Sequence, residues 1–288
     1  MATFTNRATL SYNGRTADSI IVTVTLNETL SATKVALEES YAEGTRLTYV
    51  VSLVNSGAVS FTGLTVTDDL GAYEFTDPTG VTATLYPLDY VNGSAKYFVN
   101  GVLQPELTVT STTPLVVSGI NVPAGGNAIL IYQADVNEFA PLDVDGSITN
   151  TVEVNGGTLT DGVTASETVE TLDEPNLSIT KGVASSVVTE DGAITYTFNI
   201  QNTGNTAAIE SDNVIVTDTF DPIITINSVI LDGTPLTLGT DYTYDAQTGE
   251  FATVAGVITV PAATYTRQED GSFVITPGDT MLVINGTL

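Results

Sequence analysis

The sequence contains no cysteine, no histidine and no tryptophan. Without cysteine the fold has no disulfide and performs no thiol chemistry. Without histidine as well, the usual nucleophile–base pairs, zinc sites and acid–base catalysts that titrate near neutral pH cannot be built. We therefore expect a protein that is not an enzyme and that carries no cofactor.

Basic residues are almost as scarce. Seven Lys and Arg stand against 34 Asp and Glu, which gives a formal net charge of −27. Nucleic acids and anionic membranes both require a basic face, so neither is expected as a partner. Copies of the chain should repel one another at low ionic strength, and salt or divalent ions should ease their association.

Long hydrophobic runs are also missing. No apolar stretch approaches the length that crosses a membrane, so no membrane insertion is expected. The first ten residues, MATFTNRATL, lack the basic and apolar regions of a secretion signal. If the protein works outside the cell, we expect it to leave by lysis or by an unusual route, unless a leader precedes this sequence.

What the sequence does contain is alternation of apolar and polar residues. Examples are RLTYVVSLV at residues 46–54 and AILIYQADV at residues 128–136. Thr, Val, Ile and Tyr dominate these segments, and turn signals such as NSG, VNGS and TPGD separate them. No helical period is present. The pattern predicts an all-β fold of antiparallel sandwiches, and 288 residues favour two domains.

An internal repeat divides the chain. The segment that begins LSATK at Leu30 matches the segment that begins LSITK at Leu177, and residues 125–136 match residues 277–288. The alignment pairs Lys34 with Lys181, Tyr49 with Tyr196, Asn55 with Asn202 and Asp68 with Asp218. A proline in DEPN, at residues 173–176, ends strand pairing between the repeats. We expect a first β-sandwich domain at residues 30–172 and a second at 173–288.

The second repeat lacks a strand that the first one has. The first continues past Val136 into ITNTVEVNG at residues 148–156, whereas the second stops at Leu288. A similar segment, FTNRATLSYNG, stands at residues 4–14 with no earlier domain to complete. We therefore predict that residues 1–29 are a donor strand and connector, and that the strand of one copy completes the second domain of the next. Such a head-to-tail contact propagates into a filament unless it closes into a ring.

Alternation assigns the residues of this contact. The inward-facing donor residues are Phe4, Asn6, Ala8, Leu10 and Tyr12. The acceptor groove is predicted beside the last strand, at Met281, Leu282, Val283, Ile284 and Leu288. Residues 14–29 are predicted to be the hinge or the connector between copies. Two alternatives remain: the strand folds back into its own second domain, or it is an edge strand left over from the duplication.

The same alternation puts a lysine, an aspartate and an asparagine on the apolar side of both repeats. A buried ammonium is costly unless it is paired. The interpretation that we favour is an ion pair in each repeat, Lys34 with Asp68 and Lys181 with Asp218, with the asparagines bonded to nearby backbone.

A covalent interpretation uses the same residues. A spontaneous Lys–Asn isopeptide bond needs a desolvated lysine and a neighbouring acid that shuttles protons, a role that Asp68 and Asp218 would fill. The bond would join Lys34 to Asn150 in the first repeat. In the second it would join Lys181 to Asn6 of a neighbouring copy and lock the polymer.

Other residues suggest weaker alternatives. LDVDGS at residues 142–147 is a fragment of a calcium-loop pattern that lacks the distal glutamate, so a turn is favoured over a calcium site and no metal ligands are predicted. A monomeric surface adhesin or carbohydrate-binding module is the alternative function, with ligand-binding loops around residues 87–105 and 232–256. An acid-catalysed hydrolase would need two close carboxylates in a cleft, and no pair stands out.

The residues also resemble a known family. A strand with lysine, then ITYTFNIQNTGN, NVIVTDTF and a closing ITNTVEVNG, is similar to the bacterial and archaeal surface repeats called domain of unknown function eleven. The resemblance covers nearly the whole chain. It implies immunoglobulin-like sandwiches in surface and fibre proteins, and isopeptide bonds at Lys34 and Lys181. The short two-repeat form without a leader or an anchor is similar to spore-appendage subunits, which implies an extracellular or spore-surface location.

Overall fold

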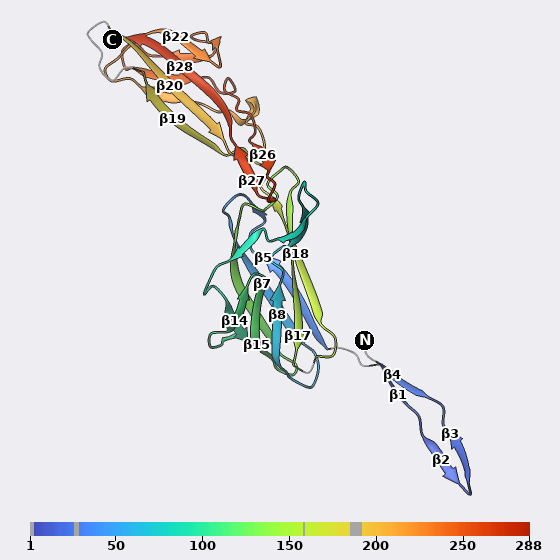
Figure 1. The fold of residues 1–288 in the computed structure, drawn as a ribbon. Helices are drawn as coiled ribbons and strands as arrows, with labels where there is room; N and C mark the ends of the chain where they lie inside the picture. Colours follow the sequence, from blue (N-terminus) through green and yellow to red (C-terminus); the bar gives the residue numbers. More distant parts are fainter. Residues whose placement is uncertain (1–2, 26–28, 158, 185–191) are drawn as a thin grey trace. The chain divides into compact units, whose positions relative to one another are not determined.

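The computed structural model describes residues 3–25, 29–157, 159–184 and 192–288 (Figure 1). The fold is all-β, as predicted: apart from the 3-10 helix η1 (Glu210–Asp212), every regular element in these ranges is a strand. No helix in this part of the chain is long and apolar enough to span a membrane. The chain forms two compact units, one of Met1–Pro141 with Ser147–Glu170 and one of Leu142–Gly146 with Thr171–Leu288.

The first unit contains two six-stranded sheets. One sheet consists of β13 (Val102–Leu103), β12 (Lys96–Val99), β16 (Asn127–Val136), β7 (Arg46–Asn55) and β5 (Leu30–Ala36), with β11 (Leu88–Tyr90) also on β16. The other runs in the order β14 (Thr108–Thr112), β15 (Leu115–Val122), β8 (Phe61–Asp68), β17 (Ser147–Gly156), β18 (Val163–Thr171) and β6 (Ser40–Tyr41). A separate hairpin joins β9 (Tyr73–Thr76) and β10 (Thr82–Leu85).

The core of this unit lies between the two sheets because every second side chain points inward. In β7 and β16, buried residues alternate with residues that are not buried along nearly the whole strand. The facing sheet contributes the buried side chains of Leu64, Val66, Val152 and Val154. This alternation is the pattern that the sequence predicted.

The second unit has fewer strands. Its larger sheet has the order β19 (Leu177–Val183), β20 (Ala193–Asn202), β28 (Gly278–Thr287), β22 (Thr225–Leu231) and β23 (Thr234–Pro235). Its smaller sheet has only three strands, in the order β21 (Thr217–Thr219), β25 (Glu250–Thr253) and β24 (Tyr242–Tyr244). A hairpin of β26 (Thr264–Arg267) and β27 (Phe273–Thr276) completes the unit. The core is rich in aromatic rings, among them Phe198, Phe220 and Phe251.

The N-terminal segment is a hairpin rather than a single strand. β1 (Thr3–Asn6) pairs with β4 (Val22–Thr25), and β2 (Thr9–Tyr12) pairs with β3 (Arg15–Asp18). Asn13 and Gly14 turn the chain with φ of 44° and 77°, the left-handed values that a tight two-residue hairpin turn requires. Residues 15–18 and 22–25, predicted as part of a hinge, are therefore strands, because they supply the ladder partners of the first strand.

Candidate functional site

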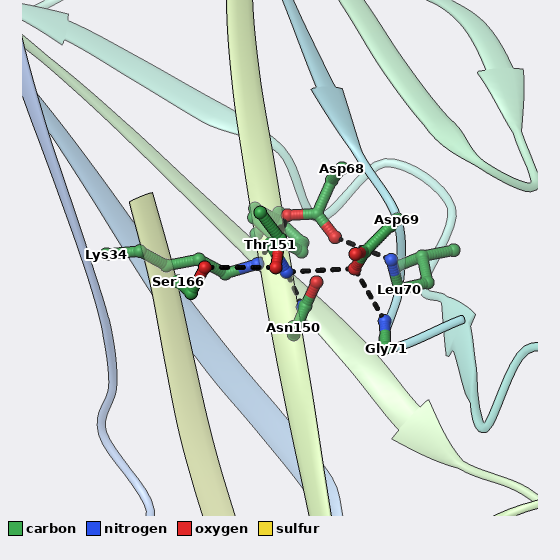
Figure 2. A network of polar contacts seen from close by, with 9 residues as sticks. Lys34, Asp68, Asp69, Leu70, Gly71, Asn150, Thr151 and Ser166 are labelled. Carbon is green, nitrogen blue, oxygen red and sulfur yellow. Dashed lines mark hydrogen bonds and ion pairs between the residues drawn. The ribbon is translucent and has the colours of Figure 1, made fainter. Parts of the chain in front are cut away.

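A buried polar cluster occupies the core of the first unit (Figure 2). The Lys34 ammonium, from β5, donates to Asp68 Oδ2 at the end of β8, with a nitrogen–oxygen distance of 2.7 Å. The two side chains are 0% and 1% exposed. The Tyr132 hydroxyl, from β16, donates to the same carboxylate oxygen. The ion pair favoured from the sequence is thus the arrangement in the structure.

Two tyrosines enclose the lysine. The Lys34 ammonium lies 4.7 Å from the ring centroid of Tyr49 and 5.9 Å from that of Tyr132. The two rings stack, with centroids 5.5 Å apart. Burial lowers the pKa of Lys34, although the Asp68 carboxylate acts in the opposite direction, and burial raises the pKa of both tyrosines. A lysine held in this way has a larger neutral fraction than one in water.

Asn150 completes the cluster from β17. It is 0% exposed, and its Nδ2 donates to the Tyr132 hydroxyl at 3.3 Å. Within the described ranges, neither its Oδ1 nor the buried hydroxyl of Tyr49 makes a hydrogen bond of standard geometry. The sequence-based expectation that this asparagine bonds to backbone is therefore wrong for its described contacts, because its amide faces side chains. A buried amide oxygen without a partner is costly, which marks this position as unusual.

Asp69 fixes β17 on β8. Its Oδ1 accepts hydrogen bonds from the backbone N–H of Thr151 at 2.8 Å and of Gly71 at 2.9 Å (Figure 2). Burial raises the pKa of Asp69, and these two hydrogen bonds oppose that shift. Asp69 thereby holds Asn150, the neighbour of Thr151, at a fixed place on the strand.

The second unit repeats the ion pair in a more open setting. Lys181 of β19 donates to Asp218 Oδ2 of β21 at 2.5 Å, but here the side chains are 41% and 16% exposed. The Lys181 ammonium lies 4.6 Å from the ring centroid of Tyr196 and 5.5 Å from that of Phe220. The lysine–aspartate pair thus recurs, with different aromatic neighbours and with less cover.

The missing cover is the counterpart of β17 and β18. In the first unit β8 pairs with β15 on one side and β17 on the other, whereas in the described chain β21 pairs only with β25. Along β5, Leu30 is buried, with 5% exposure, whereas its counterpart Leu177 on β19 is 37% exposed. Ile179 and Val183, on the same side of β19, are 53% and 47% exposed. The inner face of the second unit is therefore open at this strand.

The predicted donor residues lie on the N-terminal hairpin. Asn6 and Ala8 are exposed, and Leu10 and Tyr12 are 63% and 52% exposed. Phe4 belongs to β1, but its side chain lies outside the described residues. On the second strand of the hairpin Val22 and Val24 are also exposed. A two-stranded hairpin that exposes apolar side chains to water is marginally stable, so covering these side chains would stabilise it.

The predicted acceptor position is wrong. β28 holds Met281, Leu282, Val283 and Ile284 and ends one residue before Leu288. It lies in the middle of its sheet, with β20 on one side and β22 on the other. Its backbone ladder is occupied on both sides, so no strand can add there. Leu282 and Ile284 are fully buried and line the core, Val283 is half-buried, and Met281 and Leu288 are exposed by 43% and 36%. Among the described strands, the one with an open edge beside the Lys181–Asp218 pair is β21.

The remaining candidates offer less chemistry. At the predicted calcium fragment, the carbonyl of Asp143 accepts hydrogen bonds from Gly146 N and Thr171 Oγ1, as in a turn. In the part of the chain that the structure describes, no group of three or more carboxylates is positioned to hold a metal ion.

Sequence reasoning missed Tyr49, Tyr132 and Asp69 as members of the cluster. Alternation was the available signal for the tyrosines, because both occupy inward positions of strands whose neighbours are apolar. Alternation could not identify Asp69, because this residue follows the end of β8 and accepts a hydrogen bond from Gly71 within a turn.

Comparisons with known proteins identify no family. No protein-family model matches the chain, and no curated protein matches it. The resemblance to domain of unknown function eleven therefore stays a prediction.

Several solved structures share parts of the fold at low similarity. The pilus backbone protein RrgB of Streptococcus pneumoniae matches with 12% identity and a TM-score of 0.36, over 89% of this chain and 49% of that one. This chain thus spans about half the length of that protein. A 35 kDa C-terminal fragment of the major pilin GBS80 of Streptococcus agalactiae gives 12% identity and a TM-score of 0.36, over 81% and 79% of the two chains. The major pilin subunit BcpA of Bacillus cereus gives 9% and 0.33, over 96% and 73%.

Proposed function

We propose that this protein is the structural subunit of an extracellular filament and that it assembles head-to-tail. The N-terminal segment of one copy completes the second unit of the next copy. The contact is heterologous, so it repeats along a fibre rather than closing a symmetric dimer.

The observation that carries this proposal is a pair of matching deficits in one chain. The second unit exposes Leu177, Ile179 and Val183 on β19, whereas Leu30 on the equivalent strand of the first unit, β5, is buried. The N-terminal hairpin exposes Leu10 and Tyr12, and it resembles the segment that provides this cover in the first unit. Burying each large apolar side chain contributes about 1.5–3 kcal/mol, in addition to the strand-to-strand hydrogen bonds.

Sedimentation velocity at moderate salt tests this assembly. The full chain should form large polymers, and a variant that lacks residues 1–25 should remain monomeric. Adding a peptide of residues 1–25 to the full chain should shorten the polymers, because the peptide fills acceptor sites without extending the fibre. Equal sedimentation of the full chain and the shortened variant would contradict the proposal.

We further propose that the buried cluster forms a covalent bond between Lys34 and Asn150 that reinforces the fibre. Lys34 first gives a proton to Asp68, and its neutral amine then attacks Cγ of Asn150. The new C–N bond forms as the amide C–N bond breaks, and the amide nitrogen leaves as ammonia after taking up a proton through Asp68. The desolvated lysine, the buried acid and the unpartnered Asn150 oxygen support this step.

The intact mass of the denatured chain tests the bond. The wild type should be lighter than its sequence by one molecule of ammonia, and Asp68→Ala should restore the full mass. Asp135→Ala provides a control, because it removes a partly exposed acid that pairs with Arg46 and points to the opposite face of β16 from Tyr132. A wild-type mass equal to that of the sequence would show that the ion pair is the whole interaction.

A further inference from the structure

The N-terminal hairpin resembles the hairpin of β17 and β18 in which side chains it pairs. In the first unit Ile148 pairs with Val169 and Asn150 with Glu167. At the N-terminus Phe4 pairs with Val24 and Asn6 with Val22, and each of these pairs is one residue closer along the chain than its counterpart. The resemblance between residues 4–14 and 148–156 thus extends to a second, antiparallel strand, which follows a connection one residue shorter.

We propose that the acceptor is the free edge of β21 and that the whole β1–β4 hairpin of a second copy, rather than its first strand alone, adds there. This inference rests on the proposed function, and it specifies the place, the partner element and the register. In the first unit Val152 pairs with Asp68 and Val154 with Val66. Equivalent pairing sets Ala8 of one copy opposite Asp218 of the next, and Leu10 opposite Val216.

This register completes the half-open ion pair. Asn6 takes the place that Asn150 has in the first unit, beside Lys181 and Asp218. Lys181, 41% exposed in the single chain, then becomes buried as Lys34 is. The exposed apolar side chains of β19 gain the same cover that β5 receives. Each junction between copies would therefore repeat the arrangement at the first unit's own last hairpin.

Charge favours this partner. Residues 1–25 contain two basic and one acidic side chain, a formal charge of +1. Residues 171–288 contain 15 acidic and two basic side chains, a formal charge of −13. The hairpin is thus a nearly neutral, slightly basic element in an acidic chain, and it is attracted to a unit that repels the rest of a second copy.

Disulfide trapping between two full-length variants tests the register directly, because the natural chain has no cysteine. One chain carries Thr9→Cys and the other Thr217→Cys, at outward-facing positions that the proposal sets opposite each other. Opposed residues of antiparallel strands lie about 4.5–5.5 Å apart between Cα atoms, within the range that a disulfide bridges. The matched control replaces Thr217→Cys with Thr243→Cys on β24, the other edge of the same sheet.

After mixing and mild oxidation, peptide mapping should find a disulfide between the Thr9→Cys chain and the Thr217→Cys chain. When the second chain carries Thr243→Cys instead, no disulfide to the Thr9→Cys chain should form. If filaments form but the disulfide between positions 9 and 217 is absent, or if a disulfide between positions 9 and 243 forms in equal yield, the inference is overturned and the proposed function stands. A Thr9–Thr217 bond that forms only when one chain carries both substitutions would show fold-back within a subunit, and would overturn both. A chain that forms no filaments would also overturn both.

Discussion

The two lysine–aspartate pairs show how one set of residues behaves in two environments. Lys34 and Asp68 are fully buried, whereas Lys181 and Asp218 form the same ion pair with a larger exposed fraction. An exposed ion pair contributes little to stability because water competes for both charges. Removing one partner of a buried pair is costly because the other charge stays in the core without compensation.

This difference predicts unequal effects of the same substitution. In the unassembled chain at low salt, Asp68→Ala should lower the free energy of unfolding of the first unit by about 3–5 kcal/mol. Asp218→Ala should lower that of the second unit by only about 0–1 kcal/mol. Urea denaturation monitored by tyrosine fluorescence measures both changes. Equal losses in the two variants would mean that the second pair is as well covered as the first.

At the scale of elements, the N-terminal hairpin forms before it has a partner. Its turn at Asn13 and Gly14 has the left-handed geometry that matches the twist of the two strands. A preformed hairpin loses less conformational entropy on docking than a disordered segment does. The turn should therefore control the rate of assembly.

Gly14→Val tests the importance of this turn. At φ of 77° a β-branched residue is strained, so the hairpin should open and assembly followed by light scattering should slow severalfold. Gly80→Val is the matched control, since Gly80 has φ of 90° in the turn of the β9–β10 hairpin, which the proposed contact does not use. Slowing of both variants to the same degree would contradict a specific role for the N-terminal turn.

The sequence predicted the strands better than it predicted which strands lie side by side. Strict alternation predicted the strands, and it predicted that Lys34 and Asp68 point into the core, because side chains in a strand alternate between its two faces. Alternation says nothing about which strand lies beside which. For that reason alternation predicts neither the central place of β28 in its sheet nor the second strand of the N-terminal hairpin.

At the scale of the whole molecule, the net charge of −27 opposes association. Electrostatic repulsion between copies extends about 30 Å at 0.01 M salt and about 8 Å at 0.15 M. A contact made by strand addition and apolar burial is short-ranged and survives this screening. Assembly should therefore need salt but should not depend on which salt is used.

A salt series separates screening from a cation site. Polymer formed per hour, measured by light scattering, should rise steeply between 0.01 M and 0.15 M NaCl. At matched ionic strength, CaCl₂ and MgCl₂ should have similar effects on the rate. A strong advantage of calcium over magnesium would instead support the calcium alternative at residues 142–147 and count against simple screening.

The central claim is that the inward face of the N-terminal hairpin enters a second copy of the chain. Negative-stain electron microscopy of Leu10→Asp beside Ser11→Asp tests it most directly, because both variants add one negative charge at adjacent positions of β2. In the corresponding strand Val154 is buried and Asn155 is exposed, so Leu10 should face the core of the next copy and Ser11 should face water. We expect filaments from Ser11→Asp and none from Leu10→Asp. Filaments from both variants, or from neither, would contradict the account.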